Sequence, residues 1–362
     1  MEHRVPLLLT ICQGIILYLS IGVSSDPVVQ MENTTIRGKE ITFEGNTVYQ
    51  YLGIPYAEPP VGDLRFKKPE PLGRFPDQFD AMYPAPACRQ YTETPFPWYF
   101  NDPYKSEDCL YLNTWAPADA SPGNPKPVMV FMHSGNWKFG SSSIDYYSGV
   151  PLAALNGIVV VTFNYRLGVF GFLSSNTDDA PGNAGLWDIK ELLEWVHKYI
   201  IYFGGDPSHL TIAGQSSSAT AVGYFSLSDD AQRLYSRMIM QSGSPVNFQT
   251  DYKKQNIDLG KKLAKLVGCK EDDWDTFGSS TIQCLKSAGH FELHLNNGHL
   301  PLPFMLTVLQ APGILTPLLM GYCITELSTP IAPSATFLNR WLLRRQVCSL
   351  ENAKGFFFSV AI

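Results

Sequence analysis

The sequence has little charge and no basic cluster. Only 17% of its 362 residues are charged, and 27 lysines and arginines against 33 aspartates and glutamates give a formal net charge of −6. An acidic chain without a lysine- and arginine-rich cluster is a poor candidate for nucleic-acid binding. Hydrophobic residues make up 45% of the chain. A packed core can therefore form, which excludes general disorder.

The seven cysteines lack the spacing of a metal site, and no C-x-x-C pair occurs. The cysteines thus give no indication of a metal site. Cys12 lies in the N-terminal apolar segment, and the remaining cysteines form an even set, which in a secreted chain is typical of disulfides. These six are Cys88, Cys109, Cys269, Cys284, Cys323 and Cys348.

The N-terminus has the layout of a secretory signal peptide. A short segment ending at Arg4 precedes an apolar run over residues 7–17, and small residues over 20–25 fit a cleavage site. An uncleaved membrane anchor is the alternative, but Gln13 and Gly14 interrupt the apolar run. We predict that residues 1–25 are removed and that the protein is secreted or extracellular. Asn33-Thr34-Thr35 is then an N-glycosylation acceptor.

Apolar patterns alternate between strand and helix through the first 290 residues. Charge-free or β-branched runs are typical of strands buried on both faces of a parallel sheet, and apolar positions at helical spacing indicate helices between them. This alternation is typical of a doubly wound α/β fold. The predicted elements are a hairpin within 41–60, strands at 128–132, 158–163 and 210–213, and helices at 184–201 and 217–227.

The pattern breaks near residue 290. Only seven of the 72 residues from 291 to 362 are charged, and none from Leu293 to Thr325. A single membrane span is one interpretation of that stretch. Prolines at four positions break it, so we instead expect 291–362 to be a divergent, poorly structured apolar tail.

Ser216 is the candidate nucleophile. A catalytic serine can be exposed on a sharp turn between a buried strand and a helix, where backbone N–H groups bind the developing oxyanion. Gly214 supplies the small residue two positions before Ser216, and Ser218 stands where a second glycine is expected. The loop of residues 133–137, which follows an earlier strand, is a second candidate element, because consecutive N–H groups on such a loop can form an oxyanion hole. Its alternative is an ordinary turn.

The chain resembles the type-B carboxylesterase and cholinesterase family, whose fold is the α/β-hydrolase fold. The resemblance covers about residues 27–288 and rests on motifs that occur in the family's order. These are YLGIPYA at 51–57, PPVGDLRF at 59–66, SEDCLYLN at 106–113, NYRLG at 164–168, GNAGL at 182–186, WVH at 195–197, FGGDP at 203–207 and QSGS at 241–244.

The resemblance implies roles for individual residues. Ser216 aligns with the nucleophile, and the three N–H donors of the oxyanion hole align with Gly135, Asn136 and Ser217. The implied disulfides join Cys88 to Cys109 and Cys269 to Cys284, while Cys323 and Cys348 have no family counterpart. Ester hydrolysis through an acyl-enzyme, with a small carboxylic ester as substrate, is the implied reaction.

Several positions depart from the family. Its HGGG loop is His133-Ser134-Gly135-Asn136 here, so Ser134 and Asn136 replace two of its glycines. Its GESAG turn is 214–218, with Gln215 and Ser218 replacing glutamate and glycine. Ser218 should add bulk at a packing contact. Trp98 and Tyr99 lie near the choline-binding aromatic of cholinesterases, but their spacing to the next cysteine differs. Gorge lining or core packing is therefore the preferred interpretation.

The largest departure concerns the catalytic acid and base, which follow the serine in the family's chain order. No family motif carries either one within 291–362. Candidates without supporting context are Glu292, Glu326 and Glu351 for the acid. His290, His294 and His299 lie just past the end of the resemblance, and His294 or His299 is the candidate base, with a surface or loop histidine as the preferred interpretation. The expected organisation is a signal peptide at 1–25, an N-terminal half of a carboxylesterase domain at 26–290 with its sheet incomplete on the C-terminal side, and the tail at 291–362.

Two origins of the tail stay open, an aberrant transcript or gene prediction and a real shortened pseudoenzyme. Two functions also stay open. One is a serine esterase, of doubtful activity as the chain stands. The other is a catalytically inactive, secreted interaction protein like the family's adhesion members, with a protein partner or a second copy as ligand. Neither function requires a metal or an organic cofactor.

Overall fold

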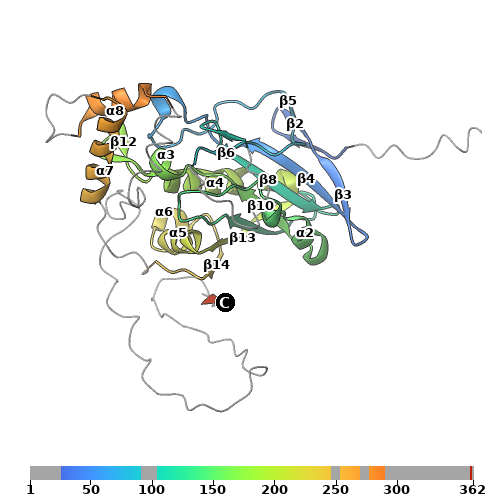
Figure 1. Ribbon diagram of the computed structural model, residues 1–362. Helices are drawn as coiled ribbons and strands as arrows, with labels where there is room; N and C mark the ends of the chain where they lie inside the picture. The colour runs from blue at the N-terminus through green and yellow to red at the C-terminus, as the bar shows by residue number, and fades with distance from the viewer. Residues whose placement is uncertain (1–25, 91–103, 246–252, 270–276, 290–358, 361–362) are drawn as a thin grey trace, which may run out of the picture.

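The computed structural model describes residues 26–90, 104–245, 253–269, 277–289 and 359–360. Its centre is an eight-stranded sheet of order β15-β14-β13-β9-β10-β8-β4-β3 (Figure 1). The strands from β15 to β10 are parallel, and β8, β4 and β3 are antiparallel to their neighbours. Their bounds are β3 Lys39–Phe43, β4 Asn46–Pro55, β8 Tyr111–Pro117, β9 Lys126–Met132, β10 Val159–Phe163, β13 Gly205–Gln215, β14 Arg237–Gln241 and β15 Ser359–Val360.

Smaller sheets and short helices surround the central sheet. Three strands form one small sheet, and two further pairs of strands form two-stranded sheets. The bounds are β1 Val28–Met31, β2 Thr34–Arg37 and β5 Gln78–Asp80; β6 Ala87–Cys88 and β7 Lys105–Ser106; β11 Ser174–Thr177 and β12 Ala180–Pro181; and the 3₁₀ turns η1 Gly62–Leu64, η2 Asp145–Tyr147 and η3 Ile200–Phe203.

The helices follow the strands as the sequence predicts. The predicted helix at 184–201 is α4, and its apolar positions are buried along one face because they recur at helical spacing. It continues into η3 and ends at Gly204, whose φ of 75° is left-handed. The bounds are α2 Val150–Asn156, α3 Gly168–Phe172, α4 Ala184–Tyr199, α5 Ser217–Phe225, α6 Asp229–Gln232, α7 Lys253–Leu266 and α8 Ser279–Ser287. The doubly wound, mostly parallel α/β sheet predicted from the sequence is confirmed.

The two faces of the sheet are covered unequally. A large core joins one face to α4 and α5, whereas a small second cluster lies under α2, which packs on β3, β4, β8 and β10. β10 is buried on both faces, as predicted. For β9 the prediction was wrong, because Met129 and Phe131 are only half-buried. Alternate side chains of a strand point to opposite faces, and α2 does not extend over β9.

The last two described helices lie at the end of the molecule away from α2 (Figure 1). A disulfide from Cys269 to Cys284 joins α8 to the segment after α7. Arg65 attaches α8 to the N-terminal part of the chain, since its Nη1 lies 2.8–3.2 Å from the carbonyl oxygens of Leu285, Lys286 and Ala288. In the described ranges, no helix has the length and apolar character needed to cross a membrane. The predicted tail at 291–362, apart from β15, and the signal peptide lie outside these ranges.

Candidate active site

Two loops meet at the carboxyl edge of the parallel strands. β13 and β9 are parallel neighbours, and their register places Gly214 beside Met132. The segments that follow, with Ser216 after β13 and His133 after β9, therefore leave the sheet side by side. Ligands of open α/β sheets bind at this edge, outside the carboxyl ends of the strands. The sheet thus brings together two candidate elements that are 80 residues apart in sequence.

Ser216 has a strained backbone. Its φ of 56° and ψ of −122° lie in a region that residues with a side chain rarely adopt. Close contacts on both sides hold this turn: a Cβ on Gly214 would lie 2.6 Å from the Ser218 carbonyl carbon, and one on Gly243 would lie 2.3 Å from the Ser216 carbonyl oxygen. The tiny residue expected two positions before the serine is thus required by packing. The conformation matches the sharp strand-to-helix turn of serine hydrolases.

The turn presents Ser216 at the start of α5. Its backbone N–H donates to the Gln241 carbonyl at 2.8 Å, and its own carbonyl accepts from the Thr220 N–H at 3.1 Å. Ser216 is half-buried, whereas Ser217 and Ser218 behind it are buried. A helix N-terminus favours negative charge through its unpaired N–H groups. The serine hydroxyl therefore lies where an oxyanion would be stabilised.

The loop after β9 is tightly folded. Gly135 has a φ of 131°, and a Cβ there would lie 1.8 Å from the Phe139 carbonyl oxygen, so only glycine fits. Its carbonyl accepts from the N–H groups of Lys138 and Phe139 at 3.0 and 3.2 Å. Asn136 has a φ of 54°, and asparagine tolerates this left-handed conformation better than most residues. The family glycine lost at position 136 is thus replaced by a residue that keeps the required backbone shape.

Ser218 joins the two loops, a role beyond the added bulk expected from the sequence. Its Oγ donates to the His133 carbonyl oxygen at 2.5 Å. The Tyr165 hydroxyl donates to the same oxygen at 3.1 Å. A glycine at 218 could not form this contact. The substitution therefore replaces close packing by a buried hydrogen bond between the nucleophile turn and the loop of residues 133–137.

The imidazole of His133 is buried and neutral. It stacks on the Tyr165 ring with centroids 4.6 Å apart, and its Nδ1 donates to the Ser134 carbonyl at 2.9 Å, because a carbonyl only accepts. Its Nε2 is buried and has no partner in the described part of the chain. Burial lowers the pKa of His133 to about 4, against a smaller opposing effect of the Ser134 carbonyl. This histidine orders the loop from within the core.

No histidine of the described ranges contacts the Ser216 hydroxyl. Besides His133, these ranges hold His197, on the exposed end of α4, and His209. The His209 Nδ1 lies 2.6 Å from Asp206 at the amino end of β13, far along the strand from Ser216. The other residues considered at the site lie outside the described residues: Trp98, Tyr99, His290, Glu292, His294, His299, Glu326 and Glu351.

Both expected cysteine pairs are present as disulfides, Cys88–Cys109 and Cys269–Cys284. Cys323 and Cys348 lie outside the described residues. Asn33 is exposed in the turn between β1 and β2, so the acceptor amide is accessible. Within the ranges that the structure covers, no group of three or more histidines, cysteines, aspartates or glutamates could hold a metal ion.

Sequence reasoning missed two residues that shape the site. Gln90 holds the end of the loop after β9: its side chain donates to the Gly140 carbonyl at 2.8 Å and accepts from the Gly140 N–H at 2.7 Å. No sequence signal links residues 50 positions apart. Gly243 supports Ser216 from behind. The QSGS motif at 241–244 has no role assigned from the sequence. A glycine after an apolar strand is the signal that could have identified Gly243.

The family model described as "Carboxylesterase family" matches residues 25–314. Acetylcholinesterase-1 of Trittame loki is 40% identical over 280 residues, covering 75% of this chain and 50% of the relative. Acetylcholinesterase of Danio rerio is 43% identical over 260 residues, covering 68% and 39%. Cholinesterase of Mus musculus is 38% identical over 292 residues, covering 77% and 46%. The chain thus spans half or less of the length of these relatives.

Proposed function

The chain belongs to the carboxylesterase family, with its α/β-hydrolase fold, and from this premise we propose that it is a serine carboxylic ester hydrolase with Ser216 as the nucleophile. The observation that supports this most is the Ser216 backbone, held at a φ of 56° and a ψ of −122° between a buried strand and α5. Strained conformations of this kind cost free energy and persist where function needs them.

In the proposed reaction the Ser216 Oγ attacks the ester carbonyl carbon. The C–O bond to the alcohol breaks, the alcohol leaves with a proton, and an acyl-serine ester forms. Water then attacks this ester and releases the acid and the free serine. The N–H groups of Gly135, Asn136 and Ser217 are the proposed donors to the tetrahedral oxyanion. The residues that serve as general base and acid are unassigned.

Covalent labelling tests the proposal directly. A fluorophosphonate probe, which reacts only with an activated serine, should label the secreted full chain. Labelling should vanish in Ser216→Ala and persist in Ser208→Ala, whose serine is exposed in the amino-terminal part of β13. Folded, secreted protein that takes up no probe would remove the enzyme proposal.

A catalytically inactive interaction protein is the second candidate. It is favoured by the substitutions in both loops, Asn136 and Ser218 in place of family glycines, since a site under no catalytic constraint can accept them. The ligand would be a protein partner or a second copy of the chain. In that case the probe fails to label, while light scattering or crosslinking of the secreted chain detects the complex.

We further propose that the protein is a secreted glycoprotein with a signal peptide at 1–25, a catalytic-domain half at 26–290 and a separate tail at 291–362. Two disulfides support an oxidising compartment, and the exposed Asn33 supports glycosylation there. N-terminal sequencing of the secreted chain should start near residue 26. In a mass measurement, Asn33→Gln should remove the mass that a glycan adds to the wild-type chain. An intact Met1 on secreted protein would contradict the first expectation.

A further inference from the structure

A small hollow lies beside the Cys88–Cys109 disulfide. Three arginines and one carboxylate line it, Arg65, Arg89, Arg166 and Glu107, together with both half-cystines. It is partly open to solvent, and its space admits about one particle the size of a water molecule. Neither Ser216 nor the loop of residues 133–137 contributes to its wall. The proposed catalytic function therefore does not account for it.

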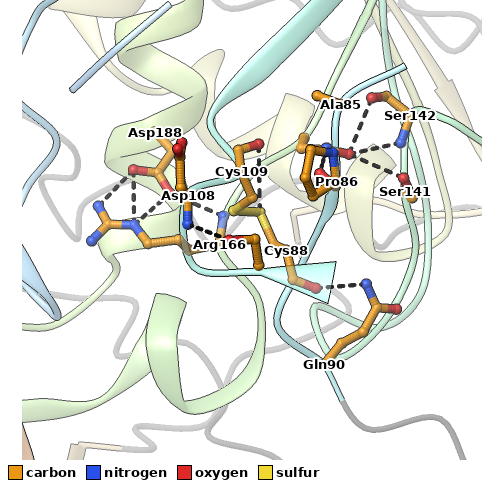
Figure 2. Close-up of a disulfide and its surroundings, with 12 residues drawn as sticks. Ala85, Pro86, Cys88, Gln90, Asp108, Cys109, Ser141, Ser142, Arg166 and Asp188 are labelled. Atoms are coloured by element: carbon orange, nitrogen blue, oxygen red, sulfur yellow. Dashed lines mark hydrogen bonds and ion pairs between the residues drawn. A yellow bond between two sulfur atoms is a disulfide. The ribbon is translucent and has the colours of Figure 1, made fainter. Parts of the chain in front are cut away.

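The charges around this hollow do not balance. Arg65 is paired with Glu107 through two hydrogen bonds of 2.7 and 2.6 Å. Arg166 is paired with Asp188 in the same two-pronged way, at 2.8 and 2.6 Å, beside the disulfide (Figure 2). Arg89 forms no ion pair with any residue in the described ranges. Among the residues that the structure describes, one positive charge of the lining therefore has no partner of opposite charge.

Two of the arginines that line the hollow also carry an unsatisfied N–H donor among the described residues. Arg166 is 2% exposed, and its Nη1 is buried without a hydrogen-bond partner among the described residues. The Nε of Arg89 is also buried and has no hydrogen-bond partner among the described residues. A guanidinium N–H can only donate, and a buried donor left unpaired costs free energy. A water molecule could accept both bonds, but it would leave the charge of Arg89 uncompensated.

We propose that this hollow binds a monatomic anion of chloride size, which accepts hydrogen bonds from the Arg89 Nε and the Arg166 Nη1. An anion satisfies both donors and cancels the excess charge at once, which water cannot do. Arg89 follows β6 and Arg166 follows β10. The bound anion thus links the segment next to Cys88 to the segment that leads from β10 into α3.

Thermal unfolding in different salts tests the site. At constant ionic strength, replacing gluconate by chloride at about ten times its dissociation constant should raise the unfolding midpoint of the full chain by about 2–4 °C. Acetate should not reproduce the rise, because the hollow admits only one water-sized particle. The rise should disappear in Arg89→Gln and persist in Arg74→Gln, whose exposed guanidinium pairs with Asp77 at the surface. An equal rise in Arg89→Gln would overturn the proposal.

Chloride nuclear magnetic resonance measures binding without relying on the variant's stability. The folded wild-type chain should broaden the ³⁵Cl resonance, and bromide should reverse the broadening by competition. Should Arg89→Gln fail to fold, this titration on the wild type decides alone. Absence of broadening, or broadening that bromide does not reverse, would leave a buried water as the occupant and refute the anion.

Discussion

At the scale of single residues, His133 is neutral in the folded protein because its ring is buried against Tyr165. Charging the ring would require a buried imidazolium with no carboxylate beside it, and burial lowers its pKa to about 4. In the unfolded chain the same group titrates near 6.5. Between these two values the unfolded state binds the extra proton, so stability rises with pH across this interval and is lost on acidification.

His133→Gln should therefore remove part of the acid sensitivity of the fold. Between pH 7 and pH 5 the wild-type chain should lose about 2 kcal/mol more unfolding free energy than the variant, since only the wild type protonates this site on unfolding. Urea unfolding at pH 7, 6 and 5 measures the difference. His197→Gln, on the exposed end of α4, controls for the loss of an imidazole. Parallel pH profiles for wild type and His133→Gln would contradict the assignment.

At the scale of secondary-structure elements, Arg65 is the connection between α8 and the N-terminal part of the chain. Carbonyls at a helix C-terminus lack partners within the helix, and the Arg65 Nη1 lies near three of them. The rest of the guanidinium is bound by Glu107, and both side chains are about nine-tenths buried. A planar, forked cation suits this double role, whereas an ammonium group does not.

Arg65→Lys should consequently destabilise the protein by about 2–3 kcal/mol, because several charge-assisted hydrogen bonds are lost at a buried site. Amide hydrogen exchange in α8 should accelerate most. Chemical unfolding and exchange mass spectrometry measure the two effects. Arg74→Lys, at an exposed ion pair, should change stability by less than about 0.5 kcal/mol. Equal effects of the two substitutions would show that Arg65 does not anchor α8.

At the scale of the whole molecule, the described residues cover one face of the sheet well and the other thinly at β9, β13 and β14. Cross-strand register places Val130, Ile212 and Met238 in one row, which packs into the core with α5. The next row, Phe131, Ala213 and Ile239, faces the other way. Phe131 and Ile239 are only half-buried, since α2 covers other strands.

Lysine substitutions on neighbouring residues of β14 should distinguish the two faces. Met238→Lys should cost about 3 kcal/mol or more, because it places an unpaired charge in the core. Ile239→Lys should cost less than about 1 kcal/mol, since a long side chain can reach solvent from the half-buried face. Urea unfolding of both variants makes the comparison. A large loss for Ile239→Lys would mean that this face is covered in the intact protein.

The order and type of the main elements follow from the amino-acid sequence alone. Apolar runs predicted β9, β10 and β13, helical spacing predicted α4, and Gly214 before Ser216 predicted the turn after β13. These features depend on residues within a few positions of one another, so local sequence contains the information. The family motifs also led to the pairing of Cys88 with Cys109 and of Cys269 with Cys284.

How distant segments complete the site and the fold becomes visible only in three dimensions. Three sets of hydrogen bonds join residues that are 50 to more than 200 positions apart in sequence. They connect Ser218 to His133, Gln90 to Gly140 and Arg65 to α8. Strand order and register set these contacts, and neither follows from local spacing. The half-exposed residues of β9 have the same cause, because a strand's burial depends on which helices the chain places over it.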